Sequence, residues 1–162
     1  RSLRNGGTVE GITATAGLSL GEFTALHLAG ALSFADGLRL VRLRGQAMQD
    51  AAEASASTML AVTGDVTEEK INELCRRASE GDVLVPANFN SPMQVVVSGS
   101  KPACERAARV AGEMGFKPTP LTVAGAFHSP FMEPAAARLA AALDEAAWTL
   151  PAAPVLSNVT GQ

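Results

Sequence analysis

A serine in a glycine-flanked pentapeptide has the clearest capacity for chemistry in this sequence. Ser19 is the centre of a G-x-S-x-G pattern at residues 17–21, between a run with β-branched residues at 11–16 and a run of helix formers at 22–29. A serine on a sharp strand-to-helix turn projects its hydroxyl out of the sheet, and glycines permit the close backbone approach that the turn needs. The pattern predicts a nucleophile; the alternative is a tight turn that merely contains a serine.

A nucleophilic serine needs a base, and the sequence holds two histidines. His27 falls more than two turns along the predicted helix after Ser19, and we expect it to be structural or on the surface. His128 falls in a predicted strand-to-helix loop, where functional groups are common, although an ordinary loop histidine is the alternative. No Asp or Glu is an obvious third member, so a carbonyl group would have to orient the imidazole. The Leu20 amide, at the predicted helix N-terminus, could stabilise an oxyanion.

Arg44 occupies an unusual position on a predicted helix at residues 34–54. The apolar residues on one broad face of this helix are Phe34, Leu40, Val41, Ala47 and Met48. Arg44 falls in the middle of that face, where a charged side chain is rare unless it is paired. Two interpretations stay open: an arginine whose head group reaches water, or a guanidinium that binds an anionic ligand.

The elements that must position these residues alternate between strand and helix. Between residues 57 and 123 the predicted order is β-α-β-β-α-β, the split βαβ or ferredoxin-like unit. Its strands are predicted at 58–63, 83–89, 94–99 and 119–123, and its helices at 67–80 and 100–114. Outside this unit we predict a strand at 9–16, helices at 20–31 and 34–54, a helix after Pro130 and a terminal strand near 155–159.

Composition excludes several classes of protein. With 162 residues, 47% hydrophobic and 18% charged, the chain is typical of a globular protein. Its net charge of −3 and lack of a basic patch argue against nucleic acid, and Glu22 and Asp36 bracket the longest apolar candidate, which is too short to span a membrane. Cys75 and Cys104 fall on apolar helix stripes and are expected to be buried thiols, and no metal-ligand spacing is present.

Four segments taken together resemble the malonyl-CoA:acyl carrier protein transacylase family. They are Gly17–Glu22, Val41–Gly45, Asn88–Pro92 and Gly125–His128, in this order and spacing. The resemblance runs through almost the whole chain. At position 18 bacterial members usually have histidine, whereas this chain has leucine. Leu18 and the residues Ala124–His128 look most like those of plastid-type members.

The resemblance implies an α/β fold in two parts. Residues 1–56 and 124–162 would form an α/β-hydrolase-like catalytic core with a parallel sheet and a nucleophile elbow. Residues 57–123 would form an inserted ferredoxin-like (βαββαβ) subdomain. The chain starts at Arg1 rather than Met and ends just after a strand-like run, so we expect a fragment. The family's N-terminal segment, which gives part of the oxyanion hole, and its C-terminal segment, which helps to orient the histidine, are expected to be missing.

The resemblance also implies roles for matching residues. Ser19 would be the nucleophile that takes the malonyl group, and His128 the general base and then the general acid. Arg44 would bind the free malonyl carboxylate by a two-pronged salt bridge, because guanidinium geometry suits a carboxylate.

Four further residues would contact the substrate or its surroundings. The Leu20 amide would belong to the oxyanion hole, and the bulk of Phe127 would disfavour a branched methylmalonyl group. Asn90 and Gln94 would line the entrance or merely hold the subdomain loop.

The implied reaction is a ping-pong transfer from malonyl-CoA, through a malonyl-serine, to the phosphopantetheine thiol of acyl carrier protein, which supplies fatty-acid elongation. No metal or redox cofactor would be needed. The partners would be malonyl-CoA and acyl carrier protein, with no nucleic acid and no membrane, and the protein would be a monomer. The plastid (chloroplast) stroma and the bacterial cytoplasm are the expected locations.

Three other functions fit parts of the sequence. The G-x-S-x-G pattern also occurs in serine esterases of the α/β-hydrolase type, against which Arg44 and the ferredoxin-like insert argue. The chain could be a carrier-protein docking module or an inactive fragment. It could also be the acyltransferase domain of a polyketide synthase.

Overall fold

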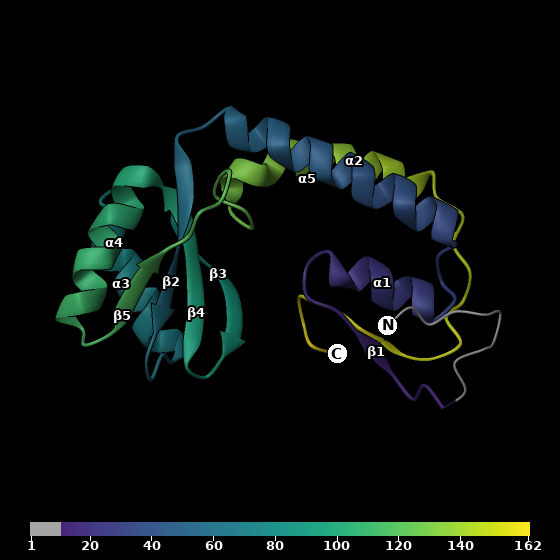
Figure 1. Cartoon of the computed structure of the whole chain (residues 1–162), viewed down its shortest axis with the longest axis horizontal. Helices are drawn as coiled ribbons and strands as arrows, with labels where there is room; N and C mark the ends of the chain where they lie inside the picture. The colour runs from purple at the N-terminus through teal and green to yellow at the C-terminus, as the bar shows by residue number, and fades with distance from the viewer. Residues whose placement is uncertain (1–10) are drawn as a thin grey trace. The chain divides into compact units, whose positions relative to one another are not determined.

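The computed structural model describes residues 11–162, so the first two residues of the strand predicted at 9–16 lie outside the described residues. The chain folds as two compact units (Figure 1). Unit 1 comprises Arg1–Leu43 and Ala141–Gln162, and unit 2 comprises Arg44–Ala140.

Unit 1 contains a parallel sheet of two short strands. Strand β1, Thr15–Ala16, pairs in parallel with β6, Val155–Leu156, and the helix α1, Gly21–Leu28, follows β1. The chain therefore has an α/β arrangement with a parallel sheet, as the sequence predicted. The strand is shorter than predicted, and the helix ends at Leu28 rather than near residue 31.

Unit 2 contains a four-stranded antiparallel sheet with the strand order β3-β4-β2-β5. Its strands are β2 (Ser57–Thr63), β3 (Leu84–Ser91), β4 (Gln94–Ser100) and β5 (Lys117–Pro120), and its helices are α3 (Glu68–Ser79) and α4 (Lys101–Glu113). The elements follow one another as β2-α3-β3-β4-α4-β5, the order predicted for residues 57–123.

The last strand of this sheet is displaced from its predicted position. It was expected at 119–123, but β5 spans Lys117–Pro120, and Leu121 leaves the sheet after its N–H donates to Met59 O. Proline cannot donate to a ladder, yet β5 holds Pro118 and Pro120 because it is an edge strand that pairs only with β2.

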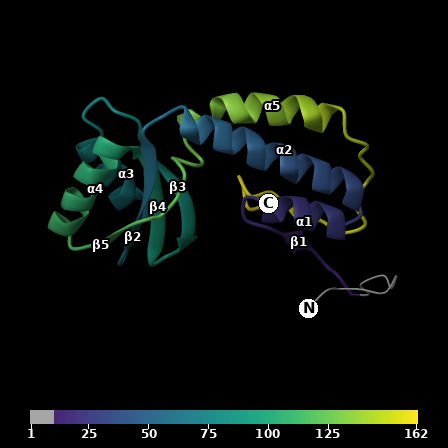
Figure 2. The same ribbon diagram turned by 45° about the horizontal axis from the view of Figure 1, so that its top comes forward.

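Helices α3 and α4 lie side by side on one face of the sheet (Figure 2). The apolar residues between the helices and this face form the largest core cluster. It includes Leu60, Val62, Ile71, Leu74, Val95, Val97 and Ala107. Cys75 and Cys104 belong to the same cluster as free, buried thiols, as predicted, and burial raises their pKa values to about 12 and about 11.

Both helices begin at side-chain caps. Thr67 Oγ1 accepts from the N–H of Lys70, and Ser100 Oγ accepts from the N–H of Ala103, with a proline in the first turn of α4. Ser100 therefore begins the helix that the sequence predicted at 100–114.

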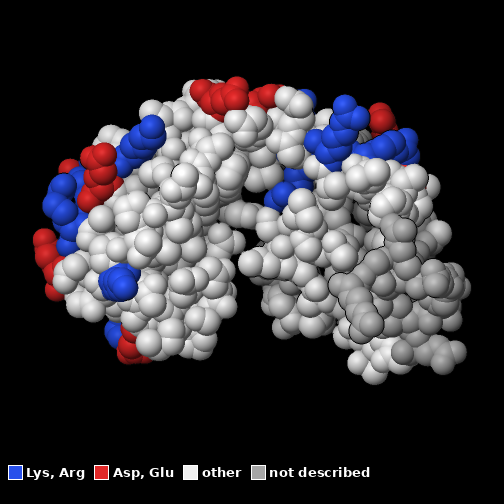
Figure 3. All heavy atoms as spheres, viewed as in Figure 1, with Lys and Arg blue, Asp and Glu red and all other residues white. Residues whose placement is uncertain are grey.

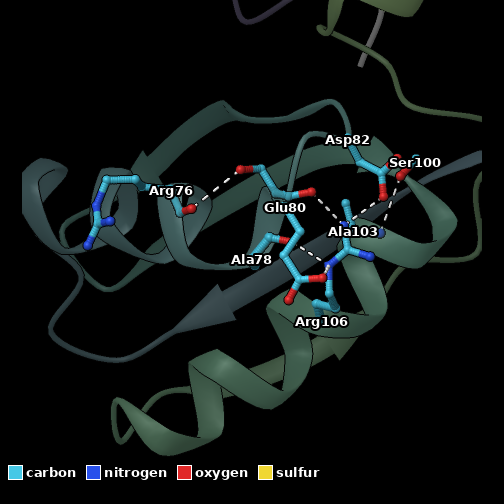
Figure 4. Close-up of polar contacts among 8 residues, drawn as sticks. Arg76, Ala78, Glu80, Asp82, Ser100, Ala103 and Arg106 are labelled. Carbon is cyan, nitrogen blue, oxygen red and sulfur yellow. Dashed lines mark hydrogen bonds and ion pairs between the residues drawn. The ribbon is translucent and has the colours of Figure 1, made fainter.

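The C-terminal end of α3 is held by an arginine from α4 (Figure 4). Arg106 Nε donates to Ala78 O over 2.7 Å, and Nη2 donates to Ser79 O and to Asp82 Oδ2, each over 2.6 Å. Glu80, the C-cap, has a left-handed backbone with φ 48°, and the N–H of Asp82 also donates to Ser79 O, over 2.8 Å.

The other face of the sheet carries a smaller apolar cluster of Met59, Ala61 and Val96. Leu121 and Phe127 pack against it. Because side chains alternate between faces, Ser57 and Ser98 lie on this face as well.

Two further helices complete the chain: α2, Phe34–Glu53, and α5, Glu133–Asp144, which follows a 3-10 turn at Pro130–Met132. Within unit 2 they pack through Ala47, Ala51, Ala52, Met132 and Ala135. Ser33 Oγ accepts from the N–H of Asp36 and so caps the N-terminus of α2.

The apolar face predicted for α2 is only partly buried. Leu40 and Ala47 are buried, but Phe34 is 68% exposed. Opposite charges are interspersed on the face of the molecule shown in Figure 3.

Among residues 11–162, no helix combines the length and apolar character needed to cross a membrane.

Candidate active site

Ser19 lies on a tight turn between β1 and α1, in a strained backbone conformation. Its φ is 53°, in the left-handed region that residues other than glycine rarely occupy. The N–H of Gly21 donates to Leu18 O over 2.8 Å, and that of Glu22 to Ser19 O over 3.2 Å, so the helix starts directly after the serine. The predicted strand–turn–helix context is observed.

The two glycines of the pattern have different surroundings. A Cβ at Gly17 would lie 2.1 Å from the carbonyl carbon and oxygen of Gly21, so the turn closes only with glycine at position 17. A Cβ at Gly21 would meet nothing within 4 Å. Steric need for glycine therefore applies to Gly17 alone.

A loop after β6 contacts this turn through Asn158, which the sequence analysis missed. Asn158 Oδ1 accepts from the N–H of Ser19, and the N–H of Asn158 donates to Glu22 Oε1 over 3.0 Å. A cavity of about 450 Å³ lies beside the turn, lined in part by Gly17, Leu18, Leu156 and Asn158. The parallel pairing of β1 and β6 explains this contact, because the carboxyl ends of parallel strands lie at one edge of a sheet.

His128 also has a left-handed backbone, with φ 58°, and is exposed. In its loop the N–H of Phe127 donates to Gly125 O over 3.0 Å, and Ser129 Oγ donates to Ala126 O over 2.6 Å. Burial and, second, the positive charge of Arg44 lower the pKa of His128 below its ordinary value. The imidazole is therefore favoured in its neutral form, which is the form that can accept a proton.

Arg44 lies on α2 and is half-buried. Burial lowers the pKa of its guanidinium from its ordinary value, but arginine stays charged in proteins. Its positive charge disfavours the protonated form of His128, and both residues belong to unit 2.

The remaining predicted residues have identifiable contacts. Phe127 packs against both the cluster between α2 and α5 and the cluster on the sheet. Asn90 Nδ2 donates to Gln94 Oε1 over 3.0 Å near the β3–β4 turn, a bond that ties the hairpin together. His27 Nδ1 lies 3.0 Å from Leu32 O, and its ring tilts against Phe34, as a structural role requires.

The predicted residues are divided between the units. Ser19 and Leu20 belong to unit 1, while Arg44, Phe127 and His128 belong to unit 2 together with the Asn90–Gln94 pair. The part of the chain that the structure describes holds no group of three His, Cys, Asp or Glu side chains arranged for a metal ion.

Comparison with known proteins identifies relatives along nearly the whole chain. The family described as acyl transferase domain matches residues 4–162. The malonyl CoA-acyl carrier protein transacylase of Escherichia coli (strain K12) is 43% identical over 145 residues, which cover 89% of this chain and 47% of the relative.

Solved structures of related proteins are also similar to this chain along nearly its whole length. An acyl carrier protein S-malonyltransferase from Vibrio cholerae has a TM-score of 0.88 and 42% identity, with 93% of this chain and 49% of that chain covered. A malonyl-transacylase in complex with a type II polyketide synthase acyl-carrier protein has a TM-score of 0.87 and 38% identity, with 93% and 48% covered. The chain thus spans about half the length of the relatives it matches.

Proposed function

The chain belongs to the acyl transferase domain family, and from this membership we propose that it forms part of a malonyl-CoA:acyl carrier protein transacylase. The observation that carries the proposal is Ser19 at φ 53° on a strand-to-helix turn that only glycine at position 17 can close. The named relatives favour this reading over a polyketide synthase acyltransferase domain or an inactive carrier-binding fragment.

In the proposed first half-reaction, Ser19 Oγ attacks the thioester carbonyl carbon of malonyl-CoA while His128 takes the hydroxyl proton. The C–S bond breaks, and His128 returns the proton to the departing CoA thiolate. A malonyl ester of Ser19 results. The lowered pKa of His128 supports this role, because a neutral imidazole is ready to accept the proton.

The second half-reaction regenerates the serine. His128 takes the proton of the phosphopantetheine thiol on acyl carrier protein, and the thiolate attacks the malonyl ester. The C–O bond breaks, and Ser19 Oγ regains the proton. Water must be excluded while the ester persists, since hydrolysis would turn transfer into thioesterase activity.

Arg44 would select the malonyl group by binding its free carboxylate. Its half-buried position supports this role, because charge-assisted bidentate hydrogen bonds are stronger away from water. An acetyl group has no carboxylate, so its complex would leave the guanidinium without that partner, at a cost of about 2–5 kcal/mol.

The other residues would act through shape and hydrogen bonding. The Leu20 amide, at the N-cap of α1, would donate to the oxyanion. The packed ring of Phe127 would exclude a branched methylmalonyl group. The bond between Asn90 and Gln94 favours a hairpin-holding role over direct contact with substrate.

The finer architecture belongs to the same proposal. Residues 1–56 and 124–162 would be part of an α/β-hydrolase-like core, and residues 57–123 a ferredoxin-like subdomain. The parallel pairing of β1 with β6 supports the first assignment. The element order of unit 2 and its strand order β3-β4-β2-β5 support the second.

The remaining proposals concern partners and location. Malonyl-CoA would be the donor and acyl carrier protein the acceptor, without a metal or redox cofactor, nucleic acid or membrane. The protein would be a monomer of the bacterial cytoplasm or plastid stroma, acting in fatty-acid synthesis. A relative seen with an acyl-carrier protein supports the acceptor.

The test is the intact mass of the protein after brief incubation with malonyl-CoA. We expect a gain of one malonyl group that is lost in Ser19→Ala and kept in Ser91→Ala, a serine exposed elsewhere in the chain. Addition of acyl carrier protein bearing phosphopantetheine should then remove the label from the serine. A label that survives in Ser19→Ala would assign the nucleophile to another residue, and no label at all in the intact protein would refute the proposal.

A further inference from the structure

The backbone of the loop that carries His128 is held at one residue by two serine hydroxyls. The N–H of Ala126, which is fully buried, donates to Ser57 Oγ over 3.0 Å. The carbonyl of Ala126 accepts from Ser129 Oγ over 2.6 Å. We name this group of Ser57, Ala126 and Ser129 the Ala126 clamp. Because both main-chain polar groups of a buried residue have partners, the loop has a defined position at this point.

A close contact holds the same loop against α2. A Cβ at Gly125 would lie 2.6 Å from the Cβ of Ala52 and 3.2 Å from Ser57 Oγ, so the loop approaches the helix as closely as glycine allows. Ser57 Oγ also lies 3.0 Å from Ser55 Oγ. The hydroxyl of Ser57, which is 3% exposed, therefore joins the segment after α2 to the histidine loop.

His128 depends on such restraints because it lies in sequence between Ala126 and Ser129, the two loop residues of the clamp. A left-handed backbone in a residue other than glycine costs about 1–3 kcal/mol and persists only where the surroundings impose it. Arg44, whose charge acts on His128, lies on α2, the helix that Gly125 contacts. The clamp and this contact together hold the loop that carries His128 against the helix that carries Arg44.

We propose that Ser57 is a positioning residue for His128, which holds the histidine loop against α2 through the N–H of Ala126. The importance of this position for catalysis rests on the proposed function; the position itself does not. Without the hydroxyl, a buried N–H loses its acceptor, and the loop must shift to find another. The imidazole would then move towards water and away from Arg44.

The experiment is an NMR titration of the His128 imidazole in the 162-residue chain, with His27 assigned through His27→Gln. In Ser57→Ala we expect the titration midpoint to rise towards the ordinary value of 6.5, because both causes of its depression weaken. In the acyl-transfer assay, kcat should fall by up to about 100-fold with KM little changed, since misplacement of a base affects the chemical step.

Ser98→Ala is the matched control. Ser98 lies on the neighbouring strand and the same face of the sheet and is fully buried, but its Oγ has no hydrogen-bond partner among the described residues. Its replacement should leave the titration of His128 unchanged. Ser57→Thr, which keeps the hydroxyl, should restore the parent titration.

Three outcomes would decide the matter. A midpoint that stays in place in Ser57→Ala while the variant is less stable would overturn the proposal and make Ser57 merely structural. If Ser57→Ala does not fold, Ser129→Ala cuts the other end of the clamp and must show the same shift, or the proposal fails. Because the titration needs no substrate, an unlabelled Ser19 would refute the proposed function and leave this result standing.

Discussion

The main-chain N–H of Ser19 donates a hydrogen bond to the side-chain oxygen of Asn158, 139 positions later in the sequence. The N–H of Asn158 in turn donates to Glu22, in the first turn of the helix that follows the serine. The strained turn is thus held from outside by a loop after β6. Such bonds from outside the turn allow the left-handed backbone conformation of Ser19 to persist.

Asn158→Ala should weaken the turn and slow acylation of Ser19. The lost acceptor should lower the free energy of unfolding by about 0.5–1.5 kcal/mol, as measured in urea. Asn158→Asp keeps an acceptor oxygen and should retain most of the acylation rate, although its charge lies close to Glu22. Equal acylation rates in Asn158→Ala and the parent chain would show that the bond has no part in positioning the serine.

Gly17→Ala and Gly21→Ala should differ sharply despite being the same change. At position 17 the new Cβ would overlap the backbone of residue 21, so we expect a loss of about 3 kcal/mol or more in unfolding free energy, at the upper end for single substitutions. At position 21 the Cβ meets open space, and we expect a change within about 0.5 kcal/mol. Thermal unfolding of both variants is the measurement; similar losses in the two would contradict the geometry of the turn.

Arg106→Ala should destabilise unit 2 far more than Arg76→Ala. The side chain of Arg106 is 16% exposed and bonds two helix-end carbonyls and Asp82, so we expect a loss of about 2–3 kcal/mol (Figure 4). Arg76 pairs with Glu73 on the surface and is 72% exposed, so its loss should cost no more than about 0.5 kcal/mol. Denaturant unfolding compares them, and equal losses would rule out Arg106 as the main stabiliser of the end of α3.

The depressed pKa of His128 predicts how stability depends on pH. Between the ordinary value of 6.5 and the lower value in the folded protein, the unfolded state binds more protons. The free energy of unfolding should therefore rise with pH through this window, and the stability should be lost as the pH falls through the folded pKa. In His128→Gln the curve below pH 6.5 should be flatter. Urea unfolding at a series of pH values tests this; an unchanged slope in His128→Gln would assign the effect to other groups.

Arg44→Ala should remove the preference for malonyl over acetyl donors. We expect the malonyl kcat/KM to fall by an amount corresponding to about 2–5 kcal/mol, with the acetyl rate little changed. Arg44→Lys keeps a positive charge but not the two-pronged geometry and should recover only part of the loss. Steady-state rates with both donors are the measurement, and preserved selectivity in Arg44→Ala would exclude a carboxylate contact.

The sequence predicted most elements but few of the contacts between them. The order of strands and helices at 57–123 followed from periodicity and from caps such as Ser100. The strand at 119–123 was wrong because apolar content does not reveal where an edge strand leaves its partner. The helical wheel grouped Phe34 with buried residues because it shows which residues share a face, but not whether another element covers it.

The sequence predicted even less of the geometry of the candidate site than of the contacts between elements. The pattern around Ser19 predicted the turn, but nothing local identified Asn158 or Ser57, whose bonds join residues far apart in sequence. The left-handed backbones of Ser19 and His128 were equally hidden, because neither residue type is specific for that conformation. Such contacts depend on tertiary structure, which periodicity does not encode.

The division of the chain has a consequence for its synthesis. Unit 2 is continuous in sequence, so all its strands have emerged from the ribosome once residue 140 is clear of the exit tunnel. Unit 1 combines both ends of the chain, and β1 must wait for β6 before it can pair. The serine turn therefore lacks its Asn158 acceptor until residue 158 has been synthesised, after all of unit 2.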